Sequence, residues 1–419
     1  MGMKKTEIGM IPEDWDVQRF SDTFRILNNN TYSRAELNYA SGQFRNIHYG
    51  DVLILFPEVL DCTREDVPYI NDGVRISSSA QPLQDGDVVM ADTAEDETAG
   101  KVTEVTNTSD KPVMAGLHTI PFRVKSGEFV PKWLGYYMNS HLYHDQLLPY
   151  IHGTKVSSVS KGSLGDTVII IPKTFEQEKI VNALSDVDAL IEKLKKLIRK
   201  KKDIRQGTMQ RVLTGKNRLQ GFSSEWKDTT LGNICDIKDG THKTPHYVES
   251  GIPFYSVETV TNDDFTHVKY ISLEEHERLT SSYKIENGDV LMTRIGSIGK
   301  GKYVDWNPNA SFYVSLALLK FRGNKPLANF IALLTGTEEF QKEAELHSLQ
   351  FAIPMKINLG QISDIRVRIP AEESEIKAII TMLNDMGSEI KRLEQKLNKY
   401  KLLKQGMMEE LLTGKVRLM

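Results

Sequence analysis

Several short patterns in the sequence could do chemistry, and each lacks part of what its chemistry requires. An amino-group methyltransferase holds a flipped base with an Asn-Pro-Pro-aromatic loop, but Asn307-Pro-Asn309 lacks the second proline and the aromatic ring. A metal-dependent nuclease needs an Asp and a Glu-x-Lys tripeptide on adjacent strands. Glu375-Ile-Lys377 and Glu389-Ile-Lys391 have the tripeptide, but they lie in a stretch with helical spacing, where residues i and i+2 point apart. We therefore predict no catalytic residues.

Patterns for a cofactor or a metal ion are equally incomplete. The segment Gly296-Ser-Ile-Gly-Lys-Gly301 matches neither a P-loop nor a dinucleotide fingerprint. His242 and His246 flank a Thr-Pro turn, and the ten histidines show no paired spacing with Cys or carboxylate residues. We predict that this chain binds no metal and no cofactor.

The compartment follows from the cysteines and from the apolar runs. Cys62 and Cys235 lie one in each half, which favours free thiols in a reducing compartment. No apolar run approaches the ~20 residues that a membrane helix needs, and no secretory signal opens the chain. We predict a cytoplasmic protein without a membrane partner.

The elements that would position any site occur twice. Apolar residues are spaced by alternating steps of four and three, the seam of a long helix, and the same spacing returns 199 residues later. The helices end in Leu213-Thr-Gly-Lys-Asn-Arg-Leu219 and Leu412-Thr-Gly-Lys-Val-Arg-Leu418, which keep that offset, so the chain contains a duplicated unit. The two seams comprise Ile180, Leu184, Val187, Ile191, Leu194 and Ile198 in the first helix, and Ile379, Leu383, Met386, Ile390, Leu393 and Leu397 in the second.

The repeat divides the 419 residues into four segments with different charge. We predict globular domains at 1–175 and 220–374, with net charges of −7 and −5, and helices at 176–219 and 375–419, with +6 and +3. A DNA-binding surface on either acidic domain must therefore be a local basic patch. The basic run Lys193 to Lys202 is either a solvated face or a contact with DNA or with an acidic partner.

Both predicted domains have the same order of short elements. Trp15 and Trp226 mark equivalent starts as apolar anchors, followed by strands at Thr23–Leu27 and Ile234–Lys238. Asp85-Gly-Asp87 and Asn287-Gly-Asp289 predict tight turns that begin core strands. Strands are also predicted at Gly42 to Phe56, Gly251–Val257, Thr167–Pro172 and Ile365–Pro370, helices at Lys132–Leu148 and Pro326–Leu346, and a Gly-rich loop at Arg294–Lys302.

One apolar seam on each long helix predicts that the two helices pair with each other. An antiparallel coiled coil covers both seams and follows from the order domain, helix, domain, helix. We predict an α+β (mixed α/β) fold with two globular domains, two long antiparallel helices and an internal pseudo-twofold repeat.

The order of these motifs resembles the specificity subunit of Type I restriction-modification systems over essentially the whole chain. The resemblance is carried by Ile11-Pro-Glu-Asp-Trp15, Asp239-Gly-Thr-His-Lys-Thr-Pro245 with Gly251-Ile-Pro-Phe254, Asn287-Gly-Asp289, Ile171-Pro172 with Glu176-Gln-Glu178, and both Leu-Thr-Gly-Lys helix ends. The second junction departs from the first, because it reads Glu373-Ser-Glu375. Residues Asn38–Ile47 and Asp92–Lys101 also fit the family pattern only loosely.

This resemblance implies a non-enzymatic DNA reader. Each domain would be a target recognition domain for one half of a bipartite, asymmetric site in double-stranded DNA, and the helices would set the spacing of the halves. The helices would also dock two methyltransferase (modification) subunits, which restriction (endonuclease/translocase) subunits join. S-adenosylmethionine, ATP and Mg would then be bound by those partners.

Residue chemistry gives the candidate DNA contacts. Phosphates are contacted by Lys, Arg, Ser and Thr, and bases by Arg, Lys, Asn, Gln or aromatic side chains on loops. The candidates are Arg45, His48, Tyr49, Lys155, Ser157 and Ser158 in the first domain, and Thr241, His242, Lys243, Arg294, Ser297, Lys300, Lys302, Gln350, Phe351 and Lys356 in the second. For the Gly-rich loop, a plain hairpin turn with solvated lysines is the alternative.

Two other classes of function compete with the DNA reader. The acidic domains would also suit a helical scaffold that assembles partner subunits without reading DNA. An enzyme with an unrecognised site is the third hypothesis, and it requires product from the chain incubated alone with S-adenosylmethionine and DNA.

Overall fold

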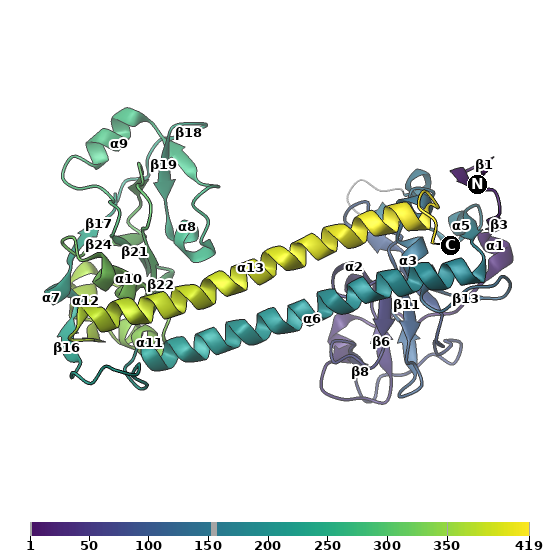
Figure 1. Cartoon of the computed structure of the whole chain (residues 1–419), viewed down its shortest axis with the longest axis horizontal. Coiled ribbons are helices and arrows are strands. Elements are labelled where there is room, and N and C mark those ends of the chain that lie inside the picture. The colour runs from purple at the N-terminus through teal and green to yellow at the C-terminus, as the bar shows by residue number, and fades with distance from the viewer. Residues whose placement is uncertain (1, 152–156, 350, 419) are drawn as a thin grey trace. The chain divides into compact units, whose positions relative to one another are not determined.

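The computed structural model describes residues 2–151, 157–349 and 351–418. The chain divides into unit 1, Met1–Leu194 with Lys396–Met419, and unit 2, Lys195–Gln395. Two long helices, α6 (Thr174–Val212) and α13 (Glu373–Leu412), each contribute one stretch to both units. Each unit is therefore a globular domain packed on a stretch of α6 and a stretch of α13, teal and yellow in Figure 1.

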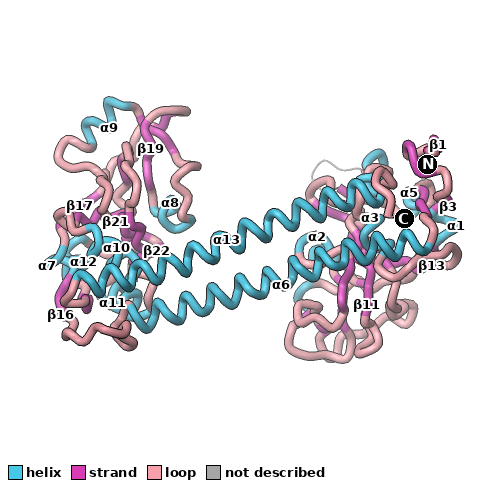
Figure 2. The backbone as a smooth tube through the Cα atoms, in the orientation of Figure 1, coloured by secondary structure: helices cyan, strands magenta, loops and turns pink. Residues whose placement is uncertain are grey.

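Among its described residues, the domain of unit 1 is built on two larger sheets and three small ones. Strands are magenta in Figure 2. The five-stranded sheet has the order β4 (Phe24–Ile26), β13 (Thr119–Val124), β9 (Val88–Ala91), β11 (Val102–Thr106), β7 (Val59–Asp61), and the four-stranded sheet β12 (Val113–Ala115), β6 (Arg45–Ile47), β8 (Tyr69–Ile70), β5 (Leu37–Asn38). The small sheets pair β15 (Val168–Ile171) with β3 (Asp16–Arg19), β1 (Met3–Thr6) with β2 (Gly9–Pro12), and β10 (Thr93–Ala94) with β14 (Ser157–Ser158). The short helices are α1 (Phe20–Thr23), α2 (Tyr49–Ile54), α3 (Trp133–Met138), α4 (His141–His144) and α5 (Lys161–Leu164), with 3₁₀ turns at Arg34–Glu36 and Leu148–Tyr150.

The domain of unit 2 repeats this plan. One four-stranded sheet has the order β17 (Asp236–Asp239), β24 (Leu316–Lys320), β21 (Val290–Ile295), β22 (Ser297–Tyr303), and the other β18 (Tyr247–Val248), β20 (Lys269–Ile271), β19 (Ile252–Tyr255), β23 (Ser311–Phe312). A small sheet pairs β16 (Lys227–Thr230) with β25 (Arg366–Ile369). The helices are α7 (Leu231–Ile234), α8 (Val257–Asn262), α9 (Leu273–Leu279), α10 (Lys325–Leu334), α11 (Glu338–Leu346) and α12 (Leu359–Asp364).

Strand order shows the duplication directly. The sequence β4-β13-β9-β11 of unit 1 corresponds to β17-β24-β21-β22 of unit 2, and β12-β6-β8-β5 corresponds to β23-β19-β20-β18. The central strands β9 and β21 follow the Asp-Gly and Asn-Gly turns, where Gly86 and Gly288 have φ of +87° and +104°. The predicted turns and the strands after them are confirmed.

The two long helices run antiparallel within each unit. In unit 1, Glu176 pairs with Arg417 and Asp188 with Lys404. In unit 2, Lys201 pairs with Glu389, and Arg205 Nε donates to Leu383 O. In each unit the residue numbers fall along the second helix as they rise along α6. The predicted seam is buried except at Met386, Leu393 and Leu397, which are half-buried. Its ends enter the domain cores: Ile180 and Leu184 join the core of unit 1, and Ile379 and Leu383 that of unit 2.

Three sequence predictions of local structure need correction. Residues 49–54 form α2, because a short apolar run is compatible with either strand or helix and His48 accepts a hydrogen bond from the amide of Gly50 at the start. The predicted helix Lys132–Leu148 is α3, α4 and a 3₁₀ turn, and Pro326–Leu346 is interrupted where Thr337 caps α11. For the Gly-rich segment, the structure has the hairpin that the sequence left as the alternative: β21 and β22 pair and turn at Gly296.

The shorter predicted strands at 23–27, 167–172 and 365–370 are confirmed as β4, β15 and β25. The strand predicted at Ile234–Lys238 begins two residues later as β17, because α7 ends at Ile234. None of the described helices has the length and apolar character that crossing a membrane requires.

Candidate nucleic-acid interface

A buried glutamate joins each domain to the first turn of its long helix. In unit 1, Glu176 is fully buried, and its Oε2 accepts hydrogen bonds from Trp15 Nε1 at 2.9 Å and from Arg417 Nη2 at 2.7 Å. In unit 2, Glu375 accepts from Trp226 Nε1 at 3.1 Å and from Arg218 Nη2 at 2.7 Å. The predicted tryptophan anchors therefore seat the domains through a charged, hydrogen-bonded group.

This geometry corrects the comparison of the two helix junctions. Glu375, and not Glu373, is the counterpart of Glu176, so the glutamates keep the 199-residue offset of the repeat. The junction of the second helix matches the first in the residue that forms the joint.

Each buried glutamate at the start of one long helix binds an arginine that follows the Leu-Thr-Gly-Lys end of the other long helix. We call each glutamate, with its tryptophan and arginine, a joint. Arg417 follows the end of α13 and binds the start of α6, whereas Arg218 follows α6 and binds the start of α13. Gly414 has a φ of +70°, and a Cβ there would lie 2.4 Å from Pro12 Cγ. The glycine is needed because the chain turns in a left-handed conformation directly against the domain entrance.

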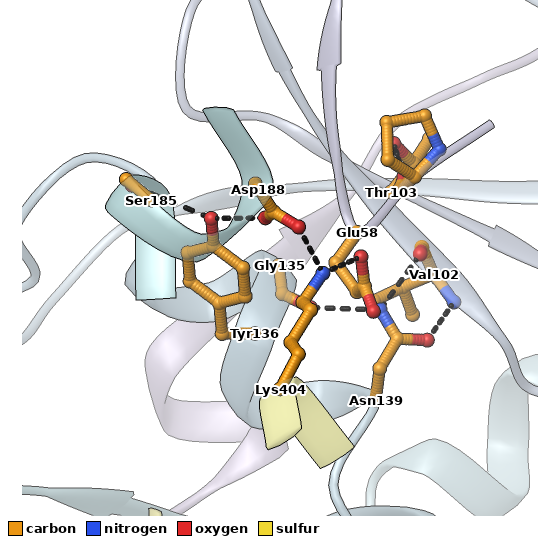
Figure 3. A network of polar contacts seen from close by, with 10 residues as sticks. Glu58, Val102, Thr103, Gly135, Tyr136, Asn139, Ser185, Asp188 and Lys404 are labelled. Carbon is orange, nitrogen blue, oxygen red and sulfur yellow. Dashed lines mark hydrogen bonds and ion pairs between the residues drawn. The ribbon is translucent and has the colours of Figure 1, made fainter. Parts of the chain in front are cut away.

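A second polar network fastens the domain of unit 1 to both helices (Figure 3). Lys404 of α13 is nearly buried, and its Nζ lies 2.5 Å from Glu58 Oε2 and 2.7 Å from Asp188 Oδ1 of α6. The hydroxyl of Tyr136 donates to Asp188 Oδ2 at 2.7 Å. Burial opposes ionisation of Glu58, but the Lys404 ammonium group outweighs it and holds the pKa of Glu58 below its usual value. The network is structural, because all its charges are paired.

Two candidate DNA contacts of the first domain are buried. Arg45 donates to the carbonyl oxygens of Arg64 and Val67 and to the hydroxyl of Tyr69. His48 lies at the start of α2, and burial lowers its pKa. Neither side chain can reach a base edge without breaking these interactions, so we assign both a structural role.

The other described candidates of the first domain come together. Tyr49 stacks edge-on against His118 with 5.2 Å between ring centroids, and His118 Nδ1 lies 3.4 Å from Thr93 Oγ1. Thr93 pairs with Ser158 and Ala94 with Ser157 in the small sheet. Lys155 lies outside the described residues. His118, a non-glycine residue at φ +52°, was not among the predicted contacts, because the sequence carries no signal for a side chain that a turn brings in.

In the second domain three separate segments meet at the end of β21. Arg294 is buried, and its Nη1 lies 2.5 Å from Asp239 Oδ1, while His242 Nε2 lies 2.8 Å from Asp239 Oδ2. Thr241 pairs with Tyr313 in an isolated bridge. Arg294 therefore positions the segment that presents the exposed side chains of His242 and Lys243.

The loop before α12 is fixed to the β21–β22 hairpin. Lys356 pairs with Ile295 and with Leu349, and the amide of Gly296 donates to Met355 O at 2.8 Å. Ser297, next to the hairpin turn, is half-buried, whereas Phe351, Lys356 and Lys300 are exposed. Gln350 is outside the described part of the chain.

Lys302 differs from the other candidate lysines. Its Nζ lies 2.5 Å from Asp263 Oδ1 and 5.5 Å from the centre of the Phe265 ring. It is therefore held by its own domain. Tyr247 was not among the predicted contacts; its ring is exposed and lies under the ammonium group of Lys269, 4.6 Å from the ring centroid. An aromatic ring beside a lysine is a surface that suits a nucleic acid.

Within residues 2–151, 157–349 and 351–418, no three His, Cys, Asp or Glu side chains are grouped to hold a metal ion. Cys62 and Cys235 are both buried free thiols, and burial raises the pKa of each to about 12.

Comparison with known proteins identifies similar chains. Residues 12–201 and 223–401 match the family described as Type I restriction modification DNA specificity domain. The chain is 23% identical, over 99% of its length and 96% of the relative's, to a putative type I restriction enzyme MjaX specificity subunit from Methanocaldococcus jannaschii.

Two solved structures share the fold. A chain from a study of complex assembly and conformational transition in the type I R-M system has a TM-score of 0.60 at 18% identity, over 97% of this chain and 99% of that one. The Type-I restriction-modification system S subunit from M. genitalium has a TM-score of 0.54 at 15% identity, over 96% of each chain.

Proposed function

The chain belongs to the Type I restriction modification DNA specificity family, and we propose that each of its two domains reads one half of a bipartite, asymmetric DNA site. DNA sequence specificity is the role of this family, which both halves of the chain match. The repeated strand order is the observation that supports recognition of two half-sites. Because the two domains share this order, each can present an equivalent surface to DNA.

We further propose that the chain has no catalytic activity of its own. The long helices would dock two methyltransferase subunits and set the spacing between half-sites, and restriction subunits would join for cleavage. In this proposal those partners hold S-adenosylmethionine, ATP and Mg. The complex would act in the cytoplasm, where a bacterial or archaeal chromosome lies.

The proposed DNA contacts of unit 2 are the exposed cations near the end of β21. Lys243, Lys300 and Lys356 project from three different segments of one domain. Arg294 and Lys302 are not included, because Arg294 forms an ion pair with Asp239 and Lys302 forms one with Asp263. Lysines in such places contact phosphates and contribute little sequence information.

A charge-reversal experiment tests this assignment. Changing Lys243, Lys300 and Lys356 to Glu in the complex with the modification subunits should weaken DNA binding and make it less dependent on salt, because fewer counterions are released. Gel shifts at several salt concentrations and adenine methylation of the target measure the effect. As a matched control we choose Lys227, Lys284 and Lys325 to Glu, three exposed lysines of unit 2 that lie on neither long helix.

The outcome separates the DNA reader from a scaffold. A scaffold that does not read DNA predicts equal DNA affinity for the reversal variant, the control variant and the wild type. Methylation of unrelated sequences at equal rates by the wild-type complex would exclude a specificity function.

A further inference from the structure

Phe351 and Ile353 are wholly exposed, each with 100% of its accessible surface in solvent. Both lie on the loop between α11 and α12, and Pro354 beside them is exposed as well. Apolar side chains of this size are normally buried, because water around them is unfavourable. Two of them at the tip of one loop indicate a surface that is covered when a partner binds.

The base of this loop is held by backbone hydrogen bonds. The amide of Leu349 donates to Lys356 O at 2.8 Å, and that of Ala352 donates to Leu349 O at 3.0 Å. On the other side, the amide of Gly296 donates to Met355 O and that of Ile357 to Arg294 O. The tip is therefore presented from a fixed base, which lowers the entropy lost when it binds.

The surroundings of the tip favour DNA as the partner. The same loop carries the exposed Lys356, and it is bonded to the hairpin end that holds Arg294, Asp239 and His242 together. The apolar tip thus continues the basic surface assigned above to DNA. Phe, Ile and Pro are also side chains that architectural proteins insert between base pairs.

We propose that Phe351 and Ile353 form a wedge that enters a base-pair step of the half-site read by unit 2. The inference rests on the proposed function. Insertion would unstack the step and bend the duplex there, so the energy of deforming that step would add to specificity without a hydrogen bond to a base.

Fluorescence of 2-aminopurine tests the wedge, because the base brightens when it is unstacked. The full chain, assembled with its modification subunits, is bound to duplexes of the sequence that the complex methylates, with 2-aminopurine placed at successive positions of both half-sites. A rise is expected at the adenines that the modification subunits flip out of the duplex, and every variant should keep it. The wild type should produce a further rise at one other step of the half-site read by unit 2. The double variant Phe351→Ala/Ile353→Ala should lose that rise and bind on the order of tenfold more weakly.

A duplex that carries a mismatch distinguishes a side chain that unstacks a base-pair step from one that only contacts the DNA surface. A mismatch at the responsive step should restore most of the affinity of the double variant, because the step is then already unstacked. Leu346→Ala is the control, since Leu346 is 72% exposed but ends α11 outside the tip. It should bind and fluoresce like the wild type.

Several results would overturn the wedge. Unchanged binding and fluorescence of the double variant would do so, as would an equal loss of affinity on matched and mismatched duplexes. Loss of the modification subunits with normal DNA binding would make the tip a protein contact. In each case a sequence-specific wild type leaves the proposed function intact; a wild type without sequence preference overturns both.

Discussion

Glu375 is 1% exposed, yet it carries a negative charge that a tryptophan and an arginine stabilise. Removing the charge of a buried carboxylate with these partners destabilises the folded state. The arginine that remains is still desolvated, but it has lost its counter-charge. The same holds for Glu176 with Trp15 and Arg417. At the scale of single residues, these two glutamates are the strongest candidates for large effects on stability.

Neutralising Glu375 should destabilise unit 2. We expect Glu375→Gln to lower the free energy of unfolding by about 3 kcal/mol, since Arg218 then faces a neutral amide. Urea unfolding measures the loss. Glu373→Gln is the matched control two residues away, because its pair with Lys377 is more than half exposed and should contribute under ~0.5 kcal/mol. Equal losses of unfolding free energy in the two variants would contradict the stabilising role assigned to Glu375 with Trp226 and Arg218.

Glu104 predicts a pH dependence of stability in unit 1. Burial raises its pKa to about 7, although the amides of Lys132 and Gly135 donate to its carboxylate. The folded state therefore holds a proton that the unfolded state releases near pH 4.5, and stability falls as pH rises from about 4.5 to 7. The loss should reach ~3 kcal/mol above pH 7.

The variant Glu104→Gln should flatten this dependence. Urea midpoints measured between pH 5 and pH 8 should change less in the variant than in the wild type. The exposed Glu65→Gln serves as a control and should keep the wild-type slope. A variant with the wild-type slope would assign the pH dependence to another group.

At the scale of elements, two glycines near the end of α13 have different surroundings: Gly406 lies within the helix, and Gly414 follows its last turn. Gly414 lies at φ +70° and would place a Cβ 2.4 Å from Pro12, whereas Gly406 is inside the helix with open space around its Cβ position. Their roles differ because one faces the domain and the other faces solvent.

Alanine substitutions should therefore have opposite signs. Gly414→Ala should destabilise the chain by roughly 1–3 kcal/mol through backbone strain and the contact with Pro12. Gly406→Ala should stabilise it by ~0.5–1 kcal/mol through helix propensity. Thermal melting of both variants beside the wild type measures the difference. Two destabilised variants would place Gly406 in a contact that the structure does not show.

At the scale of the whole molecule, α6 and α13 each contribute one stretch to both units. A helix advances 1.5 Å per residue, so under the proposed function the length of these helices would determine the spacing of the two half-sites. The Lys201–Glu389 pair marks the register in unit 2. Matched insertions on both sides of this register lengthen the helices and preserve their pairing.

Four helix-forming residues inserted after Lys200 and four after Glu389 should add ~6 Å. We expect the tolerated spacing between half-sites to grow by about two base pairs of ~3.4 Å each, with the half-site sequences unchanged. Methylation of a library of sites with varied spacers measures this. The insertion after Lys200 alone is the control, because it shifts one helix against the other and should impair folding. New half-site sequences at an unchanged spacing would contradict a spacing role.

The sequence by itself determined the repeat, the two apolar seams, the tight turns before β9 and β21 and the mixed α/β class. These features follow from local periodicity and turn chemistry, which record one-sided burial and backbone conformation near each residue. Membership in the family was also evident from motif order. The candidate DNA contacts in Lys243, Lys300, Phe351 and Lys356 stay predictions.

Only the tertiary structure decided which way individual side chains face. Arg45 and Arg294 have the right chemistry for bases, but they are bonded inside their domains. Arg417 binds Glu176 from 241 residues away, and Arg218 binds Glu375 from 157 away. Neither pairing has a local signal in the sequence, because it depends on helices that fold back and bring distant charges together.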